Sequence, residues 1–193
     1  MSVHTFHSEL ILGGQKSGKS RRAEQLAADW LVASPAHRAV FIATAQPWDD
    51  EMRARIARHQ SDRAERVPGM ATVEEPLRLA EAIAQHSRAD TLVVVDCLTL
   101  WLTNLLMPAG FEEKGPAAQE LSAPVAIFLE AVTQAPGPLV LVGNEIGLGV
   151  IPLGREVRAF VDALGSLNQQ VAQRCPRVTL MVAGLPLSLK GAA

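Results

Sequence analysis

The chain has 193 residues, of which 48% are hydrophobic and 20% are charged, and its formal net charge is −2. This composition excludes a disordered chain, and the length suits one domain, residues 1–193, with a sizeable core. The near-neutral charge gives no electrostatic support for a nucleic-acid partner, and no apolar run is long enough for a membrane span.

The first predicted elements are a strand at 9–12, a glycine-rich loop and a helix at 20–31. The loop, GGQKSGKS, fits the pattern G-x-x-x-x-G-K-[ST] of a phosphate-binding loop. Its glycines let backbone N–H groups turn toward phosphate oxygens, and the helix start adds further N–H groups. Lys19 supplies a cation for the β and γ phosphates, and the Ser20 hydroxyl can hold Mg²⁺. A chance glycine turn is the alternative, which the flanking strand and helix disfavour. The predicted nucleotide-binding residues are Gly13, Gly14, Gln15, Lys16, Ser17, Gly18, Lys19 and Ser20.

Short apolar runs alternate with helical patterns along the rest of the chain. In order, they predict a strand at 39–43, a helix at 50–60, a loop at 61–71, a helix at 76–86, a strand at 91–95, a helix at 98–107, a mobile loop at 108–119, a helix at 121–134, a strand at 139–142, a helix at 155–174 and a last strand at 178–182. The predicted inward faces are Leu77, Leu79, Ala80 and Ile83 in the 76–86 helix, and Val157, Phe160, Val161, Leu164, Leu167 and Val171 in the 155–174 helix. This alternation indicates the α/β class, with a mostly parallel sheet, helices on both faces and ligands at the carboxyl ends of the strands.

The acidic residue Asp96 ends the apolar run at 91–95. A carboxylate at this place holds Mg²⁺ in nucleoside-triphosphate enzymes, although it can also cap the next helix. Because the glycine-rich loop lies at the same predicted edge, we favour a Mg²⁺ site formed by Ser20 and Asp96.

The predicted helix at 50–60 carries Met52, Ile56 and His59 on one face, with Arg55 one turn before the histidine and Arg58 beside it. Nearby positive charge favours the neutral imidazole, which is a nucleophile. Guanidinium groups also stabilise a phosphoryl group under attack. Spacing alone favours the alternative, in which this is a solvated basic helix end with no chemical role.

The two cysteines, Cys97 and Cys175, are too few for a disulfide framework and too far apart in sequence to indicate a metal site. The first residues lack the basic start and long apolar stretch of a signal peptide. We therefore expect reduced thiols in a cytoplasmic protein.

Several segments together carry a resemblance that runs nearly end to end, namely residues 13–20, 42–45, 50–59, 72–76, 96–106, 144–152 and 165–169. The Arg-Ile-x-x-His helix and the Asn-Glu-x-Gly-x-Gly segment, in this order, are its most specific parts. On these residues the chain resembles the bifunctional adenosylcobinamide kinase/adenosylcobinamide-phosphate guanylyltransferase family of cobalamin biosynthesis.

The resemblance implies a two-step transferase. A nucleoside triphosphate, ATP or GTP, first phosphorylates the hydroxyl of the aminopropanol arm of adenosylcobinamide. His59 then attacks the α-phosphate of GTP, pyrophosphate leaves, and the covalent GMP–histidine passes GMP to adenosylcobinamide phosphate, giving adenosylcobinamide-GDP. Covalent catalysis of this kind replaces one difficult displacement by two easier ones. His59 and Lys19 are thus the implied catalytic residues, and the cofactors are GTP, ATP and Mg²⁺.

The resemblance also implies a set of guanine-nucleotide contacts. These are Thr44, Ala45, Gln46, Gln60, Ser61, Asp62, Arg63, Glu74 and Asp96. It further implies a RecA-like phosphate-loop architecture and a homotrimer, in which a neighbouring subunit can complete each site. Asn144 and Glu145 either position the corrinoid arm or the metal, or only form the turn after a strand.

Two positions depart from the family pattern. Lys16 stands where the family usually has Arg, so the charge is kept without the bidentate fork, and Met70 stands where Trp is common. Two other functions remain as alternatives: a small-molecule kinase without the nucleotidyl step, and a GTP-driven switch. The switch is disfavoured because the chain lacks the Asn-Lys-x-Asp guanine motif.

Overall fold

The computed structural model describes residues 8–47, 49–107 and 121–191. Its strands are β1 (Glu9–Gly13), β2 (Arg38–Ala43), β3 (Ala71–Glu74), β4 (Thr91–Asp96), β5 (Leu139–Val142), β6 (Arg177–Val182) and β7 (Leu185–Lys190). Its helices are α1 (Lys19–Ala33), α2 (Asp50–Arg66), α3 (Leu79–His86), α4 (Leu98–Leu106), α5 (Ser122–Gln134) and α6 (Arg155–Arg174). No helix in the described ranges is long and apolar enough to cross a membrane.

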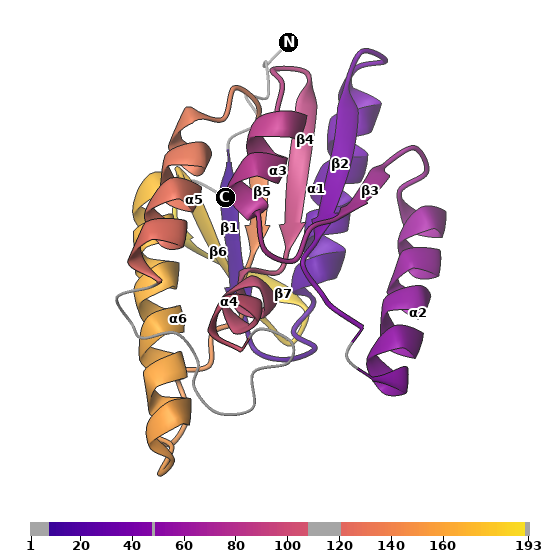
Figure 1. Ribbon diagram of the computed structural model, residues 1–193. Coiled ribbons are helices and arrows are strands. Elements are labelled where there is room, and N and C mark those ends of the chain that lie inside the picture. Colours follow the sequence, from indigo (N-terminus) through magenta and orange to yellow (C-terminus); the bar gives the residue numbers. More distant parts are fainter. Residues whose placement is uncertain (1–7, 48, 108–120, 192–193) are drawn as a thin grey trace.

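The strands form one seven-stranded sheet in the order β3-β2-β4-β5-β1-β6-β7 (Figure 1). Every neighbouring pair is parallel except β6 and β7, which are antiparallel. The predicted α/β class with a mostly parallel sheet is therefore confirmed. The carboxyl ends of β1, β2, β4 and β5 meet at one edge, because parallel strands share a direction.

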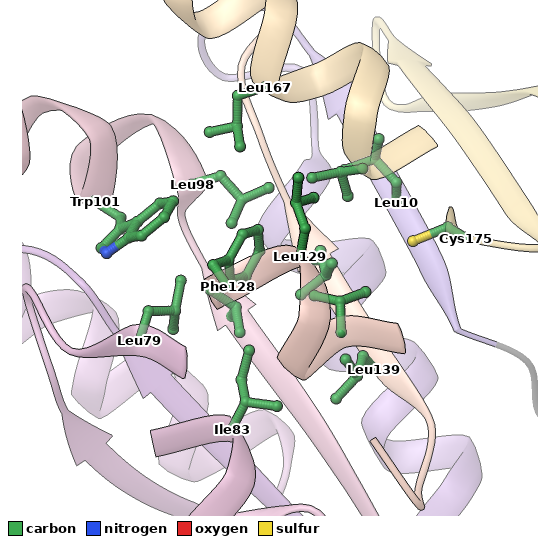
Figure 2. Packing of buried hydrophobic residues seen from close by; sticks show 14 of the residues in the cluster. Leu10, Leu79, Ile83, Leu98, Trp101, Phe128, Leu129, Leu139, Leu167 and Cys175 are labelled. Atoms are coloured by element: carbon green, nitrogen blue, oxygen red, sulfur yellow. The ribbon is translucent and has the colours of Figure 1, made fainter. Parts of the chain in front are cut away.

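Alternate side chains of the central strands point into two separate cores. Leu10 and Val93 face α3, α4, α5 and α6, where Trp101 and Phe128 are among the largest fully buried side chains (Figure 2). Ile11 faces the other side, against α1. Burial on both faces explains why these strands are continuous apolar runs rather than alternating ones.

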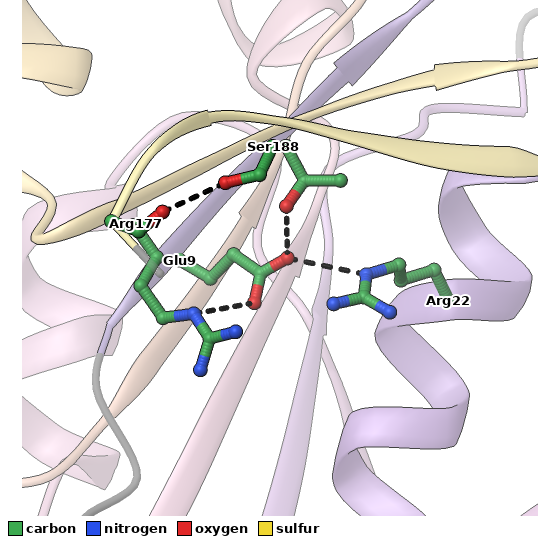
Figure 3. Close-up of polar contacts among 6 residues, drawn as sticks. Glu9, Arg22, Arg177 and Ser188 are labelled. Atoms are coloured by element: carbon green, nitrogen blue, oxygen red, sulfur yellow. Dashed lines mark hydrogen bonds and ion pairs between the residues drawn. The ribbon is translucent and has the colours of Figure 1, made fainter. Parts of the chain in front are cut away.

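A buried carboxylate ties β1 to its neighbours (Figure 3). The side chain of Glu9 is 3% exposed, and it accepts hydrogen bonds from Thr179 at 2.7 Å and Arg22 at 3.2 Å. Arg177 approaches its other oxygen at 3.8 Å. Because α1, β1 and β6 each supply one or more of these groups, the network fixes the strand that leads into the glycine-rich loop.

Helix α2 is longer than the helix that the sequence pattern predicts at 50–60. Helix α2 continues to Arg66, so residues 61–66 are helical where a loop was expected. Arg63 and Arg66 in the added turns reach Phe41 and Glu24 on other elements. Contacts of this kind favour continued helix although the local sequence is highly charged.

The sequence pattern does not predict strands β3 and β7. β3 has four residues, and every residue of β7 is exposed, so neither carries a strong apolar signal. A two-residue turn, Ala183 and Gly184, joins β6 to β7, and both residues have positive φ as in a tight hairpin.

Two predicted inward side chains point outward instead: Leu77 is 44% exposed and Val157 is 53% exposed. Leu77 precedes α3, because the Glu75 carboxylate accepts the N–H groups of Leu77 and Arg78 and forms a turn there. The predicted mobile loop at 108–119 lies outside the described residues.

Candidate nucleotide-binding site

The glycine-rich loop lies between β1 and α1 at the carboxyl edge of the sheet, in a backbone shape that needs glycine. A Cβ atom on Gly13, whose φ is +152°, would lie 2.5 Å from the Met181 carbonyl oxygen and 2.6 Å from the Ser17 hydroxyl. Gly18, the N-cap residue of α1, has φ +99° in the left-handed region, which glycine adopts without strain. Lys16 takes φ 55° although it has a side chain.

Lys19 is the buried cation of this loop. It is 8% exposed, and its Nζ donates a hydrogen bond of 2.6 Å to the Gly14 carbonyl. Burial lowers the pKa of Lys19, and the nearby Asp96 carboxylate partly offsets this. A partly desolvated cation gains most from an anionic ligand.

The hydroxyl of Ser17 is buried and has no hydrogen-bond partner in the described part of the chain. An unpaired buried donor costs free energy, so such groups mark places where a ligand completes the bonding. Together with the helix start at Lys19, this hydroxyl fits a phosphate oxygen.

Asp96 ends β4 beside β2, and its backbone carbonyl accepts the N–H of Thr44 at 3.2 Å. Its side chain is half-buried, as is that of Ser20 in the first turn of α1. In the described ranges no cluster of three or more His, Cys, Asp or Glu side chains could hold a metal by itself. One hydroxyl and one carboxylate nevertheless fit Mg²⁺, which takes its remaining ligands from phosphates and water.

Thr44 lies at the centre of a buried polar network and is fully buried. Its hydroxyl donates to the Cys97 carbonyl and accepts the Cys97 N–H, each at 2.8 Å. Asn104 donates to the carbonyls of Thr44 and Pro76. This network holds the loops after β2 and β4 together. Ala45 and Gln46, which follow Thr44, are half-buried.

Helix α2 carries the remaining candidates. Asp49 caps it by accepting the Met52 N–H at 2.7 Å. His59 and Ser61 are exposed, and Gln60 donates to Glu74 of β3 at 2.9 Å. In Figure 1, α2 stands at the β3 side of the sheet, next to α1.

Arg63 is buried, whereas His59, one turn earlier on α2, is exposed. Its guanidinium lies 3.7 Å from the centre of the Phe41 ring, and it donates to the Thr72 hydroxyl at 3.3 Å. Burial lowers the pKa of Arg63, and Glu24 opposes this. Asp62 pairs with Arg66, which also pairs with Glu24.

The candidate residues thus fall into two groups. The glycine-rich loop, the 44–46 segment, Asp96 and Glu74 lie at one sheet edge, because β3 is parallel to β2 and its last residue Glu74 pairs with Ala43, whereas residues 59–63 lie on α2. Sequence reasoning gave no role to Asn104, a buried polar residue in an otherwise apolar helix. Buried amides of this kind are a usable signal, because they need partners.

A hollow of about 450 Å³ opens beside the glycine-rich loop. It is lined by residues 14–17, by Glu145 and Leu148 from the segment after β5, and by residues 180–183 at the β6–β7 turn. The glycine-rich loop, the buried lysine and this edge of a parallel sheet define a phosphate-loop nucleotide-binding protein. A solved structure from Pyrococcus horikoshii OT3 supports the fold: its TM-score is 0.52 at 11% identity, over 97% of this chain and 87% of that chain.

Similarity to known proteins identifies the family of this chain. Residues 9–189 match the family model described as cobinamide kinase / cobinamide phosphate guanyltransferase. The chain is 48% identical over 95% of its length to a protein from Pseudomonas aeruginosa named bifunctional adenosylcobalamin biosynthesis protein CobP, of which 97% is covered. It is 36% identical over 94% of its length to an Escherichia coli K12 protein named bifunctional adenosylcobalamin biosynthesis protein CobU, of which 98% is covered. The chain belongs to the cobinamide kinase / cobinamide phosphate guanyltransferase family.

Proposed function

We propose that the chain phosphorylates adenosylcobinamide and then transfers GMP from GTP to the product. The observation that carries the proposal is the loop between β1 and α1, which holds an unpaired buried Ser17 hydroxyl and leads into the buried Lys19, whose charge interacts with that of Asp96. Membership of the family supports both activities. The phosphate contacts proposed are those of residues 13–20.

In the first step the acceptor hydroxyl oxygen bonds to the γ-phosphorus of ATP or GTP. The bond from that phosphorus to the bridging oxygen breaks, the nucleoside diphosphate leaves, and the hydroxyl proton passes to solvent. Lys19 and the loop N–H groups stabilise the charge on the transferring group. Ser20 and Asp96 are the residues proposed to hold Mg²⁺, which when bound neutralises phosphate charge.

In the second step a nitrogen of the His59 imidazole bonds to the α-phosphorus of GTP, and pyrophosphate leaves. A phosphate oxygen of adenosylcobinamide phosphate then bonds to the same phosphorus, and the phosphorus–nitrogen bond breaks. We propose that the nucleotide contacts 44–46, 60–63, Glu74 and Asp96. Because Thr44 is fully buried and its hydroxyl is already bonded twice to Cys97, we propose that Thr44 supports this contact by shaping the 44–46 segment, in which Ala45 and Gln46 are more exposed.

Labelling with GTP that carries ³²P at the α-phosphate tests the second step. Wild-type protein should retain acid-labile label, His59→Ala should retain none, and His86→Ala, a histidine at the end of α3, should label as wild type does. Wild-type protein that binds GTP without labelling contradicts the guanylyl transfer. If that protein still phosphorylates adenosylcobinamide, it is a kinase only.

We also propose a homotrimer in the cytoplasm. Leu185, Leu187 and Leu189 are all more than half exposed along the edge strand β7, and an exposed apolar edge favours association. Both cysteines are free and buried, which agrees with a reducing compartment. Sedimentation equilibrium should give three times the mass of the chain, and a monomer at working concentration would contradict the assembly.

A further inference from the structure

The segment after β5 exposes an unusual amount of apolar surface. Leu148 is 82% exposed, Val150 is 97% and Leu153 is 98%, and Ile151 between them is also exposed. Single exposed apolar residues are ordinary, but a contiguous group is rare on a protein surface and marks a binding site.

This apolar segment, residues 146–153, is held in place by its ends. The Glu145 N–H donates to the Gly13 carbonyl at 3.1 Å, and the Glu145 carboxylate accepts the Gly147 N–H at 2.9 Å. At the other end, Arg158 of α6 donates to the carbonyls of Pro152, at 2.9 Å, and Leu153. The backbone is therefore tied to the glycine-rich loop and to α6 while the apolar side chains face outward.

Two hollows adjoin the apolar segment. The hollow of about 450 Å³ joins Leu148 and Glu145 to the glycine-rich loop. A second, of about 220 Å³, lies between the segment and α6, where Arg158 and Asp162 add polar groups to an otherwise apolar lining. An apolar surface with a few polar groups is typical of small-molecule sites.

We propose that the apolar segment binds the macrocycle of the corrinoid acceptor, with its hydroxyl arm in the larger hollow beside the glycine-rich loop. The inference rests on the proposed function, since a phosphoryl acceptor must lie next to the γ-phosphate held by that loop. A corrinoid ring has broad faces rich in methyl groups and a rim of amides. The methyl-rich faces can pack against the exposed Val150 and Ile151, and the rim amides can form hydrogen bonds with Arg158 and Asp162.

The test replaces Val150 and Ile151 together by serine, a change that the exposure of both side chains allows without loss of folding. The matched control is Val32→Ser, a comparably exposed valine near the end of α1. The readouts are the KM for adenosylcobinamide in the kinase assay, the Kd for adenosylcobinamide from absorbance titration, the KM for the nucleotide, self-guanylylation from GTP alone, and the mass in solution.

The double variant should raise the KM and the Kd for adenosylcobinamide at least tenfold, and should leave the KM for the nucleotide, self-guanylylation and the mass within twofold of wild type. An unchanged KM for adenosylcobinamide overturns the inference. A lower mass of the double variant in solution also overturns the inference, because it identifies the segment as a contact between copies of the chain. If the wild-type protein neither becomes labelled by GTP nor phosphorylates adenosylcobinamide, the proposed function itself is wrong.

Discussion

Replacing Arg63 by alanine should loosen helix α2 from the sheet. The guanidinium is almost fully buried over the Phe41 ring, where a desolvated cation–π contact contributes about 2 kcal/mol. The hydrogen bond to Thr72, at 3.3 Å, is long, so about 1 kcal/mol is a reasonable contribution. Losing both weakens the docking of α2 by about 3 kcal/mol, which is roughly a 100-fold shift in its local opening equilibrium.

Hydrogen exchange followed by mass spectrometry measures this opening directly. In Arg63→Ala, the amides of α2 should exchange about 100-fold faster, whereas those of the central strands should change much less. In Arg63→Lys, the amides of α2 should exchange faster than in the wild type and slower than in Arg63→Ala, because lysine keeps the charge and loses the planar stacking group. Arg58→Ala, an exposed position on the same helix, should change exchange by no more than about twofold.

The rate of GTP-dependent self-guanylylation should fall along with α2 protection, because His59 lies one turn from Arg63 on the same helix. Unchanged exchange in Arg63→Ala would refute the anchoring argument. A lower guanylylation rate with unchanged exchange would show that Arg63 acts through its proposed contact with the nucleotide and not by anchoring α2.

Four further predictions concern buried ionisable groups. Lys19→Ala should reduce both activities by orders of magnitude while circular dichroism stays that of wild type, and an unfolded variant would contradict the assigned role. Because burial lowers the pKa of Lys19, the unfolded chain binds more protons than the folded chain near and just below pH 10.5. The contribution of Lys19 to the free energy of unfolding, measured in urea, should therefore increase as pH rises through this range. Lys19→Met should lack this increase in stability. Burial raises the pKa of Cys97 and of Cys175 to about 12, so both thiols should resist iodoacetamide at pH 8 in the folded protein and react in urea, and their contribution to stability should be lost as pH rises from 9 toward 12. Glu9→Gln should lower the free energy of unfolding by about 2–3 kcal/mol, because it leaves two partly exposed arginines without their carboxylate. The control Asp50→Asn, in an exposed ion pair, should lower it by less than about 0.5 kcal/mol. Equal losses of stability in the two variants would contradict the argument from burial.

Local patterns in the sequence were enough for the phosphate-binding loop and for most of the sheet. The loop was predictable because its glycines, lysine and serine act through adjacent backbone, which needs no distant partner. The buried strands β1, β4 and β5 were predictable because burial on both faces demands an unbroken apolar run. The bounds of α6 match because its apolar stripe has the helical period.

Tertiary structure decided the features whose partners lie far away in the chain. Helix α2 runs six residues past its predicted end, where Arg63 and Arg66 contact elements that local periodicity does not reveal. Strand β7 forms on the exposed edge of a sheet, so it lacks the apolar burial that marks a strand. The Thr44 network joins loops more than fifty residues apart. A sequence pattern reports the burial and backbone preference of neighbouring residues, whereas these features depend on which distant groups the folded chain brings within bonding distance.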